Sequence, residues 1–210
     1  MNAKLKLIVF TACLGLASCK NNEQPFNDYK FSEKGIVLNC DNLDTKLYNE
    51  ALFAFENDVM TFYGKDNPNQ VRAYSQFVRS AVNNRVKYTD MLSPHTVKVF
   101  EALKKDNSLW DANNPNSHLN YNSPFFKCIG DHIQNKDLKT TLNALVSTNS
   151  MSPKLFGTPL MSMYSLAIRD KYLAAYVAFD LFYAKLFDVD LTQVNMEKPA
   201  AAVDFNKIPN

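Results

Sequence analysis

The chain has 210 residues, of which 46% are hydrophobic and 21% charged, a size and composition typical of one globular domain with or without a tail. Its five glycines lie far apart, so no loop can place two of them around a phosphate. This excludes the P-loop, the Rossmann fingerprint and the G-x-S-x-G nucleophile elbow. The 23 basic and 21 acidic residues form no dense basic block, which excludes the electrostatic pattern of a nucleic-acid-binding protein.

The first 18 residues have the three-part layout of an export signal. A basic start with Lys4 and Lys6 is followed by the apolar run 7–16 and then by small residues. The apolar run is too short to span a membrane stably. Residues 1–18 are therefore predicted to be a signal peptide that is removed from the mature protein.

The four residues Leu16-Ala17-Ser18-Cys19 resemble the lipobox of bacterial lipoproteins, in which an aliphatic and two small residues precede a cysteine. The resemblance covers residues 1–19 only and names a processing class, not a domain family. It implies cleavage after Ser18, thioether lipidation of Cys19 and acylation, for example with palmitate, of the new amino group. Two or more acyl chains anchor a protein stably to a bilayer. An ordinary secretory signal with an incidental cysteine is the alternative.

The residues after Cys19 bear on which membrane the protein would occupy. Lys20 stands where an aspartate would resemble an inner-membrane retention signal, so we expect the outer membrane. Residues 19–23 are also similar to the charged surface-export tag of Bacteroidota lipoproteins, although only Glu23 matches it. Periplasmic and cell-surface exposure both stay open. The mature chain would have 192 residues with 21 basic and 21 acidic groups, which argues against a strongly charged partner.

Two cysteines remain once Cys13 is removed with the signal peptide and Cys19 is lipidated. They are Cys40 and Cys128, and export would place them in a compartment that permits disulfides. We predict a bridge between them that ties the segment after the tether to a helix in the middle of the chain. Two buried free thiols are the alternative. No metal or cofactor site is predicted.

The remaining chain predicts an all-α protein with irregular termini. Residues 19–35 are polar and are expected to form the lipidated N-terminus and a tether, 36–187 a helical domain, and 188–210 an irregular tail. Capping residues followed by proline recur along the domain and mark helix starts. They predict a bundle of about six helices, at 44–63, 68–90, 94–106, 124–135, 137–148 and 159–187, with a single turn at 152–157. A solenoid of helix pairs is the alternative.

Two of these helices differ in pattern. The first has apolar residues at spacings of three and four with charges between them, so one stripe is expected to face a core. The last, 159–187, has few charges in its C-terminal half and is expected to be a long helix buried at the centre of the bundle. The short apolar run 36–38 is either one strand or an extended segment packed on the body.

The candidate ligand site is a sector of the last helix. At 100° per residue, Tyr172, Tyr176, Asp180 and Tyr183 share one side of it, which predicts an aromatic cleft with one carboxylate for a small apolar or cationic ligand. The alternative is a structural carboxylate that is hydrogen-bonded by a tyrosine hydroxyl or by an arginine such as Arg79 or Arg85.

No residue pattern predicts catalysis. His95, His118 and His132 are expected to be surface or hydrogen-bonded histidines, and the Asx-rich loop 111–118 lacks the ligand ladder of an EF-hand. An enzyme remains open, because catalytic groups are assembled in space. The expected function is an interaction or accessory subunit of a cell-envelope assembly, with a protein partner and no nucleic acid. The alternative is a ligand binder that uses the cleft near Asp180.

Overall fold

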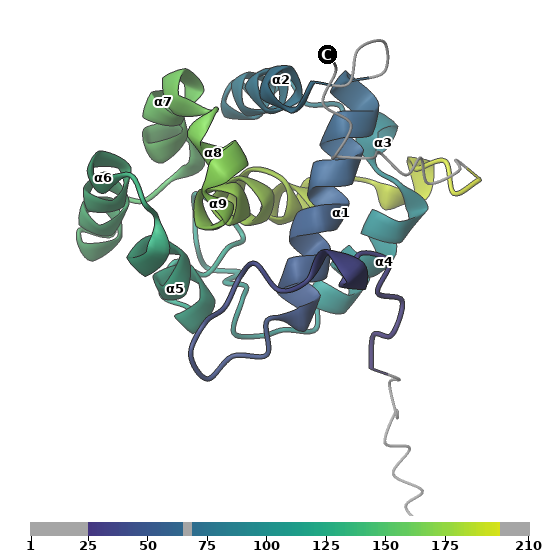
Figure 1. The fold of residues 1–210 in the computed structure, drawn as a ribbon, viewed down its shortest axis with the longest axis horizontal. Helices are drawn as coiled ribbons and strands as arrows, with labels where there is room; N and C mark the ends of the chain where they lie inside the picture. Colours follow the sequence, from purple (N-terminus) through teal and green to yellow (C-terminus); the bar gives the residue numbers. More distant parts are fainter. Residues whose placement is uncertain (1–24, 65–68, 198–210) are drawn as a thin grey trace, which may run out of the picture.

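The computed structural model describes residues 25–64 and 69–197, so the predictions for the signal peptide, for Cys19 and for residues 198–210 lie outside the described residues. The described residues are helical and contain no β-strand, which confirms the all-α class (Figure 1). Within residues 25–64 and 69–197, nine α-helices follow one another: α1 Lys46–Tyr63, α2 Gln70–Val82, α3 Tyr88–Met91, α4 Pro94–Leu103, α5 Pro124–His132, α6 Lys136–Ser147, α7 Pro153–Met163, α8 Leu166–Arg169 and α9 Lys171–Leu181. The same described ranges contain three short 3-10 helices: η1 Ser32–Lys34, η2 Tyr183–Asp188 and η3 Leu191–Gln193.

The helix starts read from capping residues and prolines are confirmed for α4 and α5. Ser93 and Ser123 each accept a backbone N–H three residues on, and a proline follows each of them at the first helical position. Ser152 caps α7 in the same way, so the predicted single turn at 152–157 is the first part of a helix that continues to Met163. The Asn67–Pro68 start falls outside the described residues, and α2 begins after Asn69, whose side chain accepts the Arg72 N–H.

Helix α1 lies at the centre of the molecule, against α2, α4 and α9. The prediction of a single buried stripe is wrong for this helix, because every residue from Tyr48 to Met60 is buried. The acidic residues among them have fixed partners. Glu56 accepts hydrogen bonds from the Tyr74 hydroxyl and the Lys171 ammonium, and Asp58 accepts the Ser93 backbone N–H.

Helix α9 is the second buried element and packs against α1, α2, α5 and α8, as Figure 1 shows. All residues from Leu173 to Leu181 are buried, so the predicted burial of this segment is confirmed. The predicted continuous helix over 159–187 is corrected. It consists of the end of α7, then α8, α9 and the 3-10 helix η2.

Local capping explains the first of the two breaks around α9. The Asp170 carboxylate accepts the backbone N–H groups of Tyr172 and Leu173, which starts a new helix after α8. At the other end, Phe182 has φ −121° and ψ −72°, outside the helical region, and the chain continues as η2. The predicted helix start at 159 is wrong, because Pro159 lies inside α7, which begins at Pro153.

The predicted helix over 68–90 is likewise divided, into α2 and α3. Asn83 ends α2, and Asn84 adopts a left-handed conformation with φ 53°, which asparagine tolerates better than most residues.

In the part of the chain that the structure describes, no helix is long and apolar enough to cross a membrane. Residues 188–197, the described part of the predicted tail, contain the last residue of η2, the short helix η3 and otherwise no regular element.

Candidate functional site

The described N-terminal segment, residues 25–45, is an arm that packs on the helical body. Phe26 and Phe31 contact the hydrophobic core, and η1 lies within the arm. In Figure 1 the arm, drawn in purple, crosses the lower end of α1. The described part of the predicted tether, 25–35, is therefore held against the domain over its whole length.

Two buried polar residues of α1 hold the arm. The Glu50 carboxylate accepts the backbone N–H groups of Lys30 at 2.7 Å and of Phe31 at 3.1 Å. The Asn49 side chain accepts the N–H groups of Val37 and Leu38, at 2.8 and 2.9 Å. It also donates to the carbonyls of Leu38 and Thr45. The run 36–38 is thus an extended segment fixed by one side chain and not a strand.

A disulfide fixes the far end of the arm. Cys40 is bonded to Cys128 of α5, with 5.8 Å between their Cα atoms, which confirms the predicted bridge. Next to it the Tyr172 hydroxyl donates to the Asn39 carbonyl at 3.0 Å and accepts the Asn39 N–H at 3.2 Å. The Tyr172 ring also stacks on His132, with 4.6 Å between the ring centroids. The predicted ligand residue Tyr172 therefore holds the arm.

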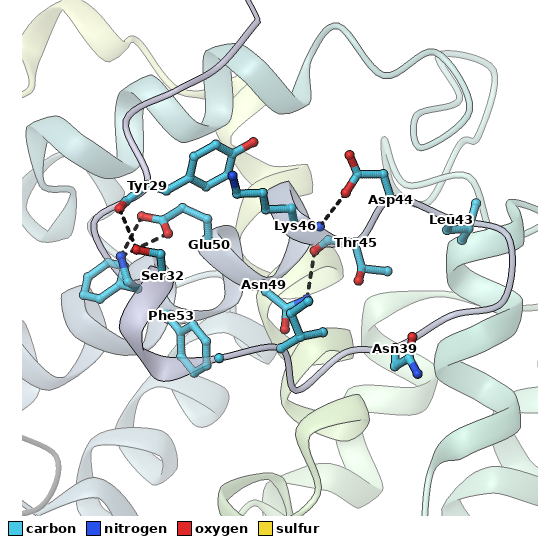
Figure 2. A pocket seen from close by; sticks show the side chains of 13 residues that line it. Tyr29, Ser32, Asn39, Leu43, Asp44, Thr45, Lys46, Asn49, Glu50 and Phe53 are labelled. Carbon is cyan, nitrogen blue, oxygen red and sulfur yellow. Dashed lines mark hydrogen bonds between the residues drawn. The ribbon is translucent and has the colours of Figure 1, made fainter.

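Between the arm and the start of α1 lies a cavity of about 470 Å³, which we call the arm pocket (Figure 2). Its size is within the range of small-molecule sites. In Figure 2, Tyr29 and Lys46 lie along one side of the pocket and Phe53 and Asn39 along the other. The pocket is lined by Tyr29, Phe31, Ser32, Gly35, Ile36, Asn39, Leu43, Asp44, Thr45, Lys46, Asn49, Glu50 and Phe53.

Aromatic rings and ammonium groups meet in and beside the arm pocket. The Lys46 ammonium lies 4.0 Å from the centre of the Tyr29 ring, a cation–π contact. The Lys34 ammonium lies 5.1 Å from the centre of the Phe31 ring and 5.2 Å from that of Phe53. Burial, followed by the charges of Asp44 and Glu50, raises the pKa of the Tyr29 hydroxyl, which therefore stays protonated at neutral pH.

Charges at the start of α1 determine which ligands the pocket can accept. The Asp44 carboxylate is exposed and accepts the Lys46 backbone N–H at 3.0 Å. A bound anion about 5 Å from it would be repelled by about 1 to 3 kcal/mol at effective dielectric constants between those of water and a protein surface. A helix N-terminus offers only about 0.3 to 1 kcal/mol in return. Asp44 therefore disfavours an anionic group bound directly beside it.

Thr45, the residue before α1, has a side-chain hydroxyl that does not cap the helix. It is 6% exposed, yet its side chain makes no hydrogen bond to the first turn of α1, and it lines the arm pocket. Threonine hydroxyls at this position usually cap the helix. Here the hydroxyl remains available to a group inside the pocket.

The Asp180 sector forms a closed cluster of hydrogen bonds. Asp180 is fully buried and accepts hydrogen bonds from the Ser117 hydroxyl at 2.7 Å and from the Tyr121 hydroxyl at 3.1 Å. Burial raises the pKa of Asp180 to about 6, although these hydroxyl groups oppose the shift. The hydrogen-bond donors to Asp180 are therefore hydroxyl groups. One of them belongs to a tyrosine, as the structural alternative predicted, and none belongs to Arg79 or Arg85.

The four residues predicted to bind a ligand do not line one cleft. The Tyr183 hydroxyl donates to the Ala51 carbonyl at 2.9 Å, while Tyr172 lies at the arm. The Tyr176 hydroxyl is buried and favours the ionised form of Asp180, but it makes no hydrogen bond of normal geometry. The arm pocket and two further cavities, of about 460 and 190 Å³, are lined by residues other than these four. The geometry therefore does not favour a ligand site at Asp180.

The three histidines have separate surroundings. His95 is buried against Glu50, His118 lies 3.0 Å from an Asp188 carboxylate oxygen, and His132 contacts the Cys128 carbonyl within α5. Among the described residues, no group of three or more His, Cys, Asp and Glu side chains could hold a metal ion. The Asx-rich loop lines part of a smaller cavity of about 190 Å³.

The sequence did not predict the arm pocket, because the polar residues 19–35 indicated a lipidated N-terminus and a tether. A usable signal was present, because Phe26, Tyr29 and Phe31 lie in that polar segment, and segments that stay solvated contain few aromatic residues.

Comparison of the chain with protein-family models, with characterised proteins and with solved structures finds no match.

Proposed function

We propose that this protein is a lipid-anchored, all-helical lipoprotein of the outer membrane that acts as an interaction or accessory subunit of a cell-envelope assembly. The lipobox at Leu16-Ala17-Ser18-Cys19 supports the anchor. The Cys40–Cys128 disulfide supports export, because disulfides persist mainly outside the cytoplasm.

The observation that carries the interaction role is the position of the arm pocket. Pro25, the first residue that the structure describes, lies six positions after Cys19, and six extended residues span at most about 20 Å. A lipidated Cys19 would therefore keep Pro25, and with it the start of the segment that lines the pocket, close to the membrane surface. Fixed aromatic and polar groups in a cavity of this kind suit recognition of a partner.

The anchor is tested by expressing the full chain in a bacterial host that processes lipoproteins. We expect wild type in the outer-membrane fraction with the mass of a chain that begins at an acylated Cys19. Cys19→Ala should give an uncleaved or soluble product. The matched control is Cys13→Ala, which alters a cysteine of the signal peptide and should leave lipidation intact. Unchanged mass and fractionation of Cys19→Ala would refute the lipoprotein proposal.

A further inference from the structure

The arm pocket combines an apolar floor with polar groups that can both donate and accept hydrogen bonds. Phe31, Leu43 and Phe53 supply apolar surface, and the two rings lie 6.4 Å apart. The Thr45 hydroxyl can donate or accept, and the Asp44 carboxylate has accepting capacity beyond its bond to the Lys46 N–H. An occupant that fits this lining has an apolar group next to a donor and an acceptor.

The lining carries two carboxylates, Asp44 and Glu50, and one ammonium group, Lys46. A second ammonium group, Lys34, lies beside it over the Phe31 and Phe53 rings, so the charges in and beside the pocket balance and favour an uncharged occupant. The second carboxylate, Glu50, is already engaged by two backbone N–H groups and His95. An anionic group would meet the Asp44 carboxylate, and a cationic group would meet the ammonium of Lys46, which already covers the Tyr29 ring.

The rim of the pocket extends the apolar surface outward. Ile36 is 69% exposed, the most exposed of the large hydrophobic side chains in the described part of the chain, and it lines the pocket. A small molecule enclosed in the cavity would leave this side chain in water. A longer occupant that enters the pocket and continues over Ile36 would cover it.

We propose that the arm pocket binds an extended, uncharged peptide segment of a partner protein. An apolar side chain of the segment packs on Phe31 and Phe53. A neighbouring backbone amide bonds through its carbonyl to the Thr45 hydroxyl and through its N–H to the Asp44 carboxylate. This inference rests on the proposed role as an interaction subunit and names the chemistry of the partner.

The test uses the full mature chain carrying Cys19→Ala, so that a failure of lipid anchoring cannot affect the result. Capped tripeptides of the form acetyl-Ala-X-Ala-amide, with X as Phe, Leu, Glu or Lys, are titrated into isotope-labelled protein by NMR. We expect the Phe and Leu peptides to shift the amide signals of Thr45, Lys46 and Phe53 saturably. The Glu and Lys peptides should bind at least tenfold more weakly.

Two variants locate the site. Thr45→Val should weaken binding of the Phe peptide at least fivefold, whereas Thr141→Val, on the exposed surface of α6, should leave it unchanged. Ile36→Glu changes an exposed side chain that the fold does not need, and it should also weaken binding at least fivefold. The proposal is overturned if no peptide shifts these signals, if all four bind equally, or if Ile36→Glu binds like wild type.

Discussion

The carboxylate of Glu50 and the imidazole of His95 lie 2.6 Å apart, Oε1 to Nε2, and both side chains are 2% exposed. This contact joins α1 to α4, and the same carboxylate holds the arm through Lys30 and Phe31. The other ring nitrogen of His95, Nδ1, lies 3.6 Å from an Asp28 carboxylate oxygen, too far for a hydrogen bond. Three segments that are distant in sequence therefore meet at one buried carboxylate.

Glu50→Ala should lower the free energy of unfolding by about 3 kcal/mol or more, because it leaves two backbone N–H groups and a buried imidazole without their acceptor. Urea denaturation measures the change, and hydrogen exchange of the Lys30 and Phe31 amides should accelerate. Glu33→Ala, at an exposed position of the arm, is the control and should change stability by less than about 0.5 kcal/mol. Equal effects of the two substitutions would contradict a structural role for Glu50.

Reduction of the Cys40–Cys128 disulfide should lower the free energy of unfolding by about 4 kcal/mol, because the bridge closes a loop with a sequence separation of 88 residues. Denaturant melts with and without a reductant measure the difference. The double variant Cys40→Ser, Cys128→Ser should match the reduced protein and should not respond to the reductant. A response of the double variant would assign the effect to something other than this bridge.

The raised pKa of Asp180 makes stability depend on pH. Its pKa is about 6 in the folded protein and near the usual 3.8 when unfolded, so the folded state binds more protons between these values. Stability should therefore fall as pH rises from about 4 to about 6, by an amount on the order of 3 kcal/mol from this group.

Asp180→Asn should remove this dependence. The asparagine carbonyl can accept the hydrogen bonds of Ser117 and Tyr121, and its amino group can donate to the Tyr176 hydroxyl, which has no partner in the described residues. Relative to wild type, the variant should gain stability as pH rises from 4 to 7, measured by urea melts at several pH values. A constant difference across this range would show that Asp180 does not titrate there.

Gly157→Ala should destabilise the contact between α2 and α7. A Cβ atom at this position would lie 2.6 Å from a methyl group of Val82, closer than side chains allow. We expect a loss of about 1 to 3 kcal/mol in a thermal or urea melt. Adding Val82→Ala should recover part of the loss, because it makes room for the new methyl group. Additive losses in the double variant would argue against this contact as the cause.

The sequence alone determined the features that depend on local chemistry. Serine followed by proline marked the starts of α4 and α5, because a capping hydroxyl and a missing N–H both suit a first helical turn. The count of cysteines predicted the Cys40–Cys128 bridge, and the scarcity of charge after Tyr172 predicted a buried segment.

The tertiary structure alone decided which polar groups are buried and what they bind. Glu50, Glu56 and Asp58 are charges between the apolar residues of the first predicted helix, yet each is buried and has a partner from a distant part of the chain. The arm pocket depends in the same way on contacts from the arm to α1. A residue's spacing along its own helix gives the direction of its side chain, but whether water or another segment lies in that direction depends on how the whole chain packs.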